Sequence, residues 1–142
     1  MLLASNPYHC QEIFTLVIKK EWHIARARNM VEELAISMGF AKISTYELIT
    51  SLSELGYNLF FHSHGGGVVH VSRLLRSGAE GIQLLSIDHG PGIASLTDAL
   101  TDGYSTNGGL GGGLPGVKRL MNEFEIESNN QGTRIKCIKW SL

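Results

Sequence analysis

The chain has 142 residues, of which 43% are hydrophobic and 18% are charged. This balance is typical of one globular domain and excludes a disordered chain. With 12 basic and 13 acidic residues the net charge is -1, which argues against binding nucleic acid or an anionic membrane through bulk charge. We therefore expect a single domain over residues 1–142, with no nucleic-acid or membrane partner.

The cysteines and the first residues of the chain indicate a cytoplasmic protein. Cys10 and Cys137 lie far apart and belong to no CxxC pair, which is typical of a protein from a reducing compartment. No apolar run approaches the ~20 residues that a membrane helix needs. The N-terminus carries neither the basic region nor the apolar core of a secretion signal.

The N-terminal half predicts one strand followed by two helices. Partial alternation of apolar residues predicts a strand over residues 13–18. Residues 22–38 place apolar side chains on one helical face, and Gly39 follows where a glycine C-cap would lie. The pattern Ser44-x-x-Glu47 resembles a capping box and predicts a second helix over residues 45–61.

The C-terminal half predicts a hairpin, a glycine-rich stretch, a helix and a second hairpin. Strands over residues 68–74 and 82–87 are expected to pair through a turn at 77–81. Pro115 suits the first turn of a helix, because its fixed φ is helical and its missing N–H has no partner there. The other expected elements are a short helix near 96–101, a helix from 115 to about 123, and strands over 124–128 and 133–140 with a turn at 129–132. Without regular βαβ alternation, this order favours an α+β two-layer sandwich, with one mixed, mostly antiparallel sheet and helices on one face.

Two polar residues of the second predicted helix form the first candidate site. Glu54 and Asn58 are four residues apart, so their side chains lie on one face, one turn from each other. A carboxylate can accept a proton, and an amide oxygen can coordinate a hard cation such as Mg²⁺. A solvated surface pair is the alternative for this spacing taken alone.

A second candidate site begins where the predicted strand over residues 82–87 ends. Asp88 follows this strand, and Gly90 and Gly92 allow the backbone to approach a ligand closely. The carboxylate can accept a hydrogen bond from an exocyclic amine such as that of adenine. An ordinary turn built from Asp, Gly and Pro is the alternative.

A glycine run directly before the last predicted helix forms a third candidate site. Its members, with the leucines among them, are Gly108, Gly109, Leu110, Gly111, Gly112, Gly113 and Leu114. Free backbone N–H groups and the positive end of the helix dipole favour an anion here, most naturally phosphate. Leucines at fixed places in the run and the helix that follows it are not typical of a flexible linker. The run neither follows a strand directly nor contains GxxxxGK[ST], so a Rossmann or P-loop site is not favoured.

The order of these motifs, completed by Thr133 at the start of the last predicted strand, resembles the GHKL ATPase superfamily with the Bergerat fold. Within that superfamily the chain is similar to the RsbT-like serine/threonine switch kinases. The resemblance extends from about residue 14 to residue 140. Its most specific stretches are residues 88–93, 103–106 and 108–121, the last of which ends in Leu-Pro-Gly-Val-Lys-Arg-Leu-Met.

For the phosphate end of the site, the resemblance implies ATP and Mg²⁺ as cofactors. Asn58 is expected to be the Mg²⁺ ligand, and Glu54 the general base that takes the proton from a substrate hydroxyl. Residues 108–113 are expected to form a lid whose N–H groups hold the β- and γ-phosphates. These roles suit phosphoryl transfer, which chiefly needs a held nucleotide, a metal ion and an oriented hydroxyl.

For the adenine end of the site, the resemblance implies roles for four further residues. Asp88 is expected to bind the adenine amine, and Gly90 and Gly92 are expected to let the chain pass under the base. Thr133 is expected to support adenine beside Asp88. Taken alone, the hydroxyl of Thr133 carries little information, and a plain turn is the alternative.

The resemblance also implies protein partners. The substrate would be a serine or threonine of a STAS-domain antagonist protein, and the released kinase would bind and activate a PPM-type phosphatase or another output protein. A homodimer is left open. The alternative function is a non-catalytic, nucleotide-gated binding module that sequesters a sigma factor or a phosphatase. Glu54 favours the kinase, because a pure binding module needs no base.

Two features depart from the family pattern. Gly56 lies inside the second predicted helix, where a glycine costs ~1 kcal/mol relative to alanine. It either loosens the helix or makes room for a neighbour. Residues 1–12 are expected to form an N-terminal extension.

Overall fold

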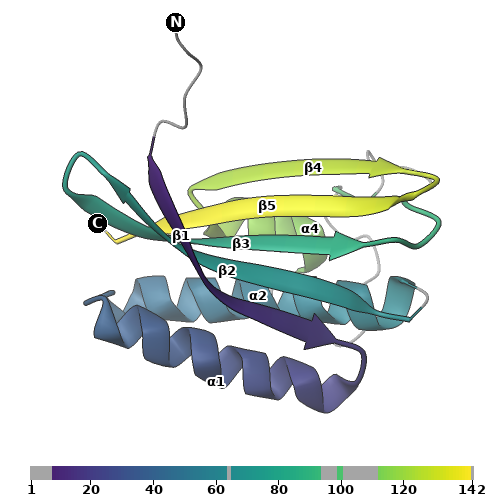
Figure 1. The fold of residues 1–142 in the computed structure, drawn as a ribbon, viewed down its shortest axis with the longest axis horizontal. Helices are drawn as coiled ribbons and strands as arrows, with labels where there is room; N and C mark the ends of the chain where they lie inside the picture. Colours follow the sequence, from purple (N-terminus) through teal and green to yellow (C-terminus); the bar gives the residue numbers. More distant parts are fainter. Residues whose placement is uncertain (1–7, 64, 94–98, 101–111, 142) are drawn as a thin grey trace, which may run out of the picture.

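The computed structural model describes residues 8–63, 65–93, 99–100 and 112–141. Within them the chain forms five strands and three helices, in the order β1, α1, α2, β2, β3, α4, β4, β5 (Figure 1). The strands are β1 (His9–Ile18), β2 (Gly67–Arg76), β3 (Ala79–Asp88), β4 (Glu123–Asn129) and β5 (Gly132–Trp140). The helices are α1 (Glu21–Ser37), α2 (Lys42–His62) and α4 (Gly113–Leu120). Most of the short helix expected near residues 96–101 lies outside the described residues.

The five strands form one sheet in the order β1-β2-β3-β5-β4. Every described pair of neighbouring strands is antiparallel, where the sequence predicted a mixed, mostly antiparallel sheet. The sheet has no parallel pair among these strands because of the position of β5. It lies between β3 and β4, which run in the same direction and are joined through α4, so these two strands never become neighbours.

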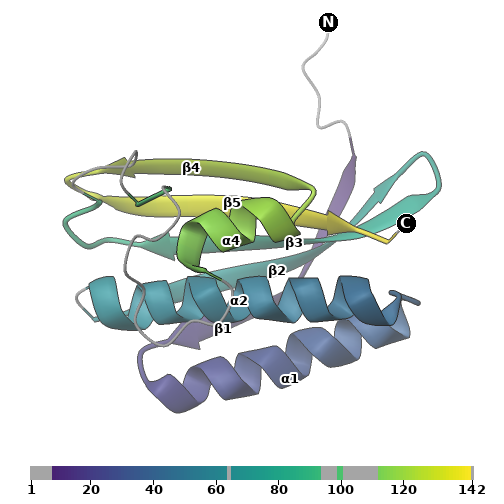
Figure 2. The ribbon, with the colours of Figure 1, turned by 180° about the vertical axis from the view of Figure 1, so that it is seen from behind.

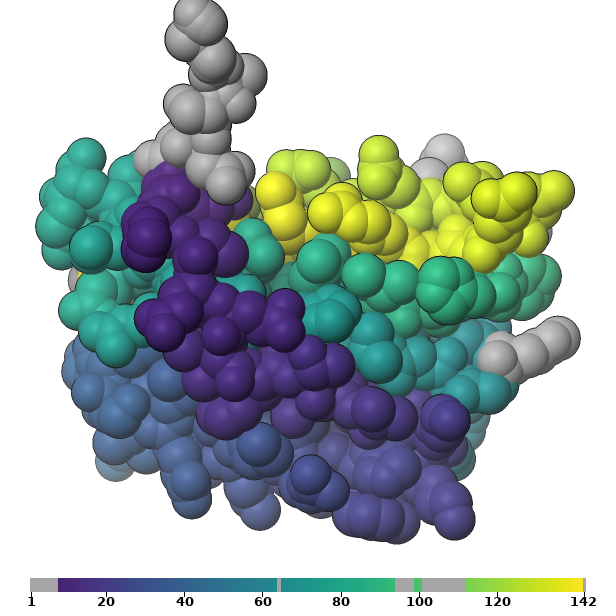
Figure 3. Space-filling view, viewed as in Figure 1, coloured from purple at the N-terminus to yellow at the C-terminus, as the bar shows by residue number. Residues whose placement is uncertain are grey.

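The helices cover one face of this sheet, which confirms the predicted α+β sandwich (Figures 1 and 2). The largest buried cluster lies between the two layers and includes Leu48, Leu52 and Leu55 of α2 together with Val71 and Leu84 of the sheet. In the space-filling view, β1 crosses the centre of the visible surface, with the other strands above it and the helical layer below it (Figure 3).

A smaller apolar cluster lies at one end of the sheet. It contains Leu74, Ile138 and Trp140, and Tyr8 packs against it with its ring 5.9 Å from that of Trp140. β1 begins at His9, so residues 9–12 of the expected N-terminal extension pair with β2. No helix of the described residues is both long and apolar enough to cross a membrane.

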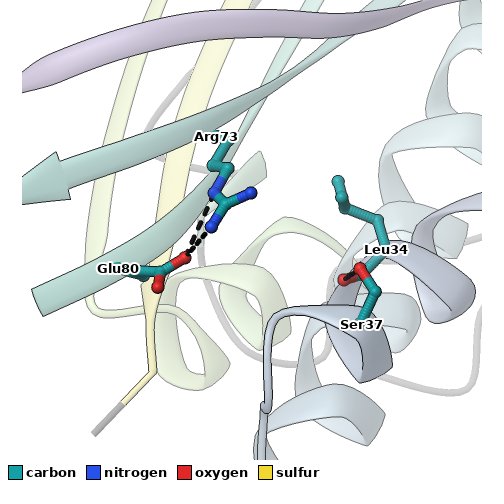
Figure 4. Close-up of polar contacts among 4 residues, drawn as sticks. All are labelled: Leu34, Ser37, Arg73 and Glu80. Atoms are coloured by element: carbon teal, nitrogen blue, oxygen red, sulfur yellow. Dashed lines mark hydrogen bonds and ion pairs between the residues drawn. The ribbon is translucent and has the colours of Figure 1, made fainter.

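Local sequence signals explain some element ends and fail at others. Gly39 follows α1 with φ 81°, and its N–H and that of Phe40 donate to the carbonyls of Ile36 and Ala35, which is a Schellman motif. At the same end of the helix, the Ser37 hydroxyl donates to the Leu34 carbonyl at 2.7 Å (Figure 4). In the β2–β3 hairpin, Ser77 and Gly78 both have positive φ. Two such residues form the turn that suits the twist of paired strands.

The predicted boundaries of two helices were wrong. The capping box at Ser44 is not used, because α2 begins three residues earlier with Ala41 as its N-cap. The last helix begins at Gly113 instead of Pro115, and residue 123 belongs to β4. In the second case Met121 adopts an extended conformation, and the Asn122 N–H donates to the Ile138 carbonyl at 2.9 Å, so pairing with β5 ends the helix.

Candidate active site

The ends of five helices and strands lie at one end of the sandwich, on the left in Figure 2. The sheet register brings together the start of β2, the end of β3 and the start of β5, because Val68 pairs with Ile87 and Asp88 pairs with Thr133. α2 ends at His62, shortly before β2 begins. The last carbonyl of α4 contacts the far end of β5, so the N-terminus of α4 points back toward this same end. Each candidate motif therefore has a described part at this end of the molecule.

Glu54 and Asn58 lie in the C-terminal half of α2. Glu54 is 3% exposed and Asn58 is half-buried, so they are not the solvated surface pair that their spacing alone allowed. Buried carboxylates are rare unless they have partners or a chemical role. Gly56 between them faces α1, and a Cβ there would lie 3.0 Å from Cγ1 of Ile24. This close contact favours the second reading of Gly56, in which it makes room for a neighbour.

Asp88 is the last residue of β3 and is 8% exposed. Its Oδ1 accepts a hydrogen bond from the N–H of Gly90 at 2.8 Å, which orients the carboxylate from its own turn. An ionised carboxylate can accept about four hydrogen bonds. Capacity therefore remains for an amine donor of a ligand such as adenine.

A hydroxyl pair connects this turn to the β4–β5 hairpin. Thr133 is buried opposite Asp88, and its Oγ1 lies 2.8 Å from Oγ of Ser128, which shares one hydrogen bond with it. Ser128 also accepts a hydrogen bond from the N–H of Ile93 at 2.7 Å. The sequence analysis missed Ser128. The signal was available only through the hairpin register, which pairs Ser128 with Thr133.

Gly92 is required by close contact as well as by its backbone angle. Its φ is 84°, and a Cβ there would overlap the carbonyl oxygen of Asn129 and lie 3.0 Å from Oγ of Ser128. Gly132 has the corresponding place on the hairpin, since a Cβ there would overlap the carbonyl oxygen of Asp88. The chain after β3 thus lies directly against the β4–β5 turn, with no room for a side chain between them.

The N-terminus of α4 contains the described part of the glycine run. Gly112 is the N-cap and Gly113 the first helical residue, with φ of 82° and 71°, values that glycine adopts far more readily than other residues. Leu114 is 5% exposed and belongs to the core, so its side chain anchors the helix. The predictions for Gly108, Gly109, Leu110 and Gly111 lie outside the described residues.

The charge near the start of α4 is positive. The helix dipole places a partial positive charge there, and the first N–H groups of a helix have no partner within it. Nη2 of Arg119 is the nearest atom to a Cβ built on Gly112, at 3.1 Å, so the guanidinium reaches back to the helix N-terminus. The N-terminal N–H groups, the helix dipole and the nearby guanidinium together suit an anion such as phosphate.

The buried thiol of the sheet has no part in this chemistry. Cys137 is 0% exposed, and burial raises its pKa to about 12. A thiol with such a pKa stays protonated at neutral pH, and the thiolate is the reactive form. Cys137 is therefore not a candidate acid, base or nucleophile.

Comparison with known proteins gives three findings. Residues 17–139 match the family of histidine kinase-like ATPase domains. The chain is 38% identical over 136 residues to the serine/threonine-protein kinase RsbT of Bacillus subtilis, covering 95% of this chain and 98% of that protein. Among solved structures it is similar to the histidine kinase domain of the blue-light-activated histidine kinase from Erythrobacter litoralis EL346. That similarity has a TM-score of 0.49 and 17% identity, over 96% of this chain and 69% of the other.

Proposed function

The chain belongs to the family of histidine kinase-like ATPase domains and is a serine/threonine-protein kinase of the RsbT type, and from this premise we propose its substrate and mechanism. It transfers the γ-phosphoryl group of ATP to a serine or threonine hydroxyl of a STAS-domain antagonist protein. The observation that carries this proposal is that the C-terminal half of α2, which contains Glu54, runs toward the end of the fold where Asp88 and the start of α4 lie.

The residues at this end fit a nucleotide. Asp88 has hydrogen-bonding capacity beyond its bond to Gly90, which suits the adenine amine. Gly92 keeps the chain beneath the base close to the hairpin, and Thr133 lies opposite Asp88 to support the same end of the ligand. Gly112 and Gly113 suit the phosphates, because they open the N-terminus of a helix with positive φ.

In this mechanism the buried carboxylate of Glu54 is the general base. It accepts the proton of the substrate hydroxyl while that oxygen forms a bond to the γ-phosphorus and the bond to the β-phosphate breaks. One positioned base contributes typically 10²–10⁴-fold to a rate. ATP supplies the phosphoryl group, and Mg²⁺ would neutralise phosphate charge, with the amide oxygen of Asn58 as its protein ligand.

The proposal extends to the partners and the setting of the kinase. A kinase that is released from its substrate presents a free surface, and we assign to it the binding and activation of a PPM-type phosphatase or a similar output protein in the cytoplasm. The similarity to RsbT over 95% of the chain supports this partner-switching role.

Phosphate transfer to a STAS-domain protein tests the proposal directly. Wild-type protein is incubated with γ-labelled ATP, Mg²⁺ and a purified STAS-domain protein, with Glu54→Gln as the test variant. Glu33→Gln is the matched control, because Glu33 is an exposed glutamate of α1. We expect label on the STAS protein with the wild type and Glu33→Gln, and loss of at least about 10²-fold in rate with Glu54→Gln.

Each other outcome has a definite meaning. Normal transfer by Glu54→Gln would exclude Glu54 as the base. ATP binding by the wild type without transfer to any STAS protein would support the nucleotide-gated binding module instead. Asp88→Asn is expected to weaken ATP binding far more than folding, and equal ATP affinity of this variant and the wild type in titration calorimetry would remove Asp88 from the adenine site.

A further inference from the structure

Lys139 occupies a place in β5 where the strand pattern puts core residues. Ile135, Cys137 and Lys139 alternate along the same side of the strand, and the first two are fully buried beneath the helices. Lys139 pairs across the sheet with Ile82, which is 0% exposed, and its own side chain is only 10% exposed. A lysine is almost never buried this far without partners, so its contacts indicate its role.

The ammonium of Lys139 connects two helices. Nζ lies 2.8 Å from Oε1 of Glu47 on α2, and it donates a hydrogen bond to the carbonyl of Leu120 at 2.7 Å. Leu120 is the last residue of α4, where carbonyls lack partners within the helix and a cation is favoured by the dipole. One side chain thus ties the C-terminus of α4 to the first half of α2.

The segment after α4 is held by the same end of β5. The Asn122 N–H donates to the Ile138 carbonyl at 2.9 Å, and the Trp140 N–H donates to Oδ1 of Asn122 at 2.7 Å. Nε1 of Trp140 donates to Oε2 of Glu123 at 2.9 Å. The C-terminal end of α4 is therefore held by polar contacts, whereas its N-terminal half is held by buried apolar side chains such as Leu114. The opposite end begins at the positive-φ glycines of the phosphate site.

We propose that Lys139 is a positioning residue that sets the phosphate end of the site without contacting the nucleotide. From its contact with Leu120, α4 extends ~10 Å to Gly113 at its N-terminus, and from its contact with Glu47, α2 extends ~10 Å to Glu54. Lys139 therefore contacts both helices at similar distances from the site. Its two contacts keep the start of α4 at about the same position along the sandwich as the carboxylate of Glu54. The inference rests on the proposed function and concerns only the phosphate end, since Asp88 belongs to β3.

The test separates the two ends of the nucleotide. Lys139→Met keeps an unbranched side chain and removes the ammonium, and titration calorimetry measures the Kd of ATP and of adenosine. We expect the Kd of ATP to rise about tenfold, equivalent to ~1.4 kcal/mol, while that of adenosine stays within about twofold of the wild type. Amide hydrogen exchange of residues 113–120, measured without nucleotide, is expected to become faster.

A second ion pair provides the matched control. Nη2 of Arg73 lies 2.6 Å from Oε1 of Glu80 on the β2–β3 hairpin, far along the sheet from the phosphate site (Figure 4). Arg73→Met removes a charge and an ion pair there, and it is expected to leave both Kd values and the exchange of α4 unchanged. If Lys139→Met does not fold, Glu47→Gln carries the same test with a smaller expected rise in the Kd of ATP.

The outcomes separate this inference from the proposed function. Equal loss of ATP and adenosine affinity in Lys139→Met, or an unchanged Kd of ATP with unchanged exchange, would overturn the positioning role. In that case α4 is held by its apolar side chains, such as Leu114 and Val117, without help from the ion pair. A wild-type protein that binds no ATP would instead overturn the proposed function.

Discussion

Replacing Gly92 by alanine tests the close approach between the chain after β3 and the β4–β5 turn. Gly92 has φ 84°, and a Cβ on it would overlap the carbonyl oxygen of Asn129. The oxygen belongs to backbone, so the overlap cannot be relieved by rotating a side chain. The segment must move away from the hairpin, and the hydrogen bond from the Ile93 N–H to Ser128 Oγ, now 2.7 Å, must lengthen or break.

The magnitude follows from two terms. A non-glycine residue in the left-handed region costs roughly 1–2 kcal/mol. Loss of the hydrogen bond between Ile93 and Ser128 costs about 0.5–1.5 kcal/mol. We therefore expect Gly92→Ala to lower the free energy of unfolding by about 2–3 kcal/mol, measured by urea denaturation with an unchanged m-value. ATP affinity is expected to fall as well, because the displaced segment carries the turn that orients Asp88.

Gly39→Ala is the matched control for this prediction. Gly39 has a similar φ of 81°, but a Cβ on it would meet nothing within 4 Å. It should therefore cost only the backbone term of about 1–2 kcal/mol and leave ATP affinity unchanged. If both variants lose the same stability and neither loses ATP affinity, the close approach at Gly92 does not exist in solution and the reasoning fails.

Three further predictions concern side chains in and around the core. Oγ of Ser51 is buried without a hydrogen-bond partner among the described residues, so Ser51→Ala should raise the free energy of unfolding by about 1 kcal/mol. A lower free energy of unfolding for this variant in urea denaturation would contradict the prediction. Burial raises the pKa of Cys137 from an ordinary 9.0 to about 12, so the thiol loses its proton more readily in the unfolded chain. Its contribution to the free energy of unfolding is therefore fully present below pH 9 and is lost as the pH rises from 9 toward 12. Between pH 8 and pH 10 the free energy of unfolding of the wild type should thus fall by about 1.4 kcal/mol more than that of Cys137→Ala. Equal falls for the two proteins in urea denaturation would refute the raised pKa. Ser128→Ala leaves the Ile93 N–H without its acceptor and should cost about 1 kcal/mol and weaken ATP binding, whereas Ser37→Ala, at the exposed end of α1, should leave ATP binding unchanged.

The periodicity of the sequence was sufficient for the kind and order of the elements. Hydrophobic spacing indicated two long helices after the first strand, and both are present as α1 and α2. Gly39 was correctly assigned as a C-cap, because a Schellman motif depends only on neighbouring residues. Boundaries that depend on distant partners were predicted less well. β1 is longer than expected because β2 pairs with it from His9 onward, and α4 ends early because Asn122 pairs with β5.

For the candidate site, too, the sequence predicted local features and missed those that depend on distant partners. The spacing of Glu54 and Asn58 placed them on one helical face, but only packing makes Glu54 almost fully buried. The glycine run before the last helix indicated an anion site, and the positive φ of Gly112 and Gly113 agrees with a backbone that needs glycine there. Ser128 was missed because its partner Ile93 is 35 residues away, and no local pattern connects the two.

What the sequence by itself determined is therefore the local part of this protein: the helices and strands, the side chains that share a face, and the order of motifs that identifies its family. The tertiary structure alone decided which distant groups meet. Alternation assigns Lys139 to the inner side of β5, but only the folded chain brings Glu47 and the end of α4 to its ammonium. The physical reason is that periodicity reports the direction of a side chain, whereas its neighbours depend on the register and packing of segments far apart in the chain.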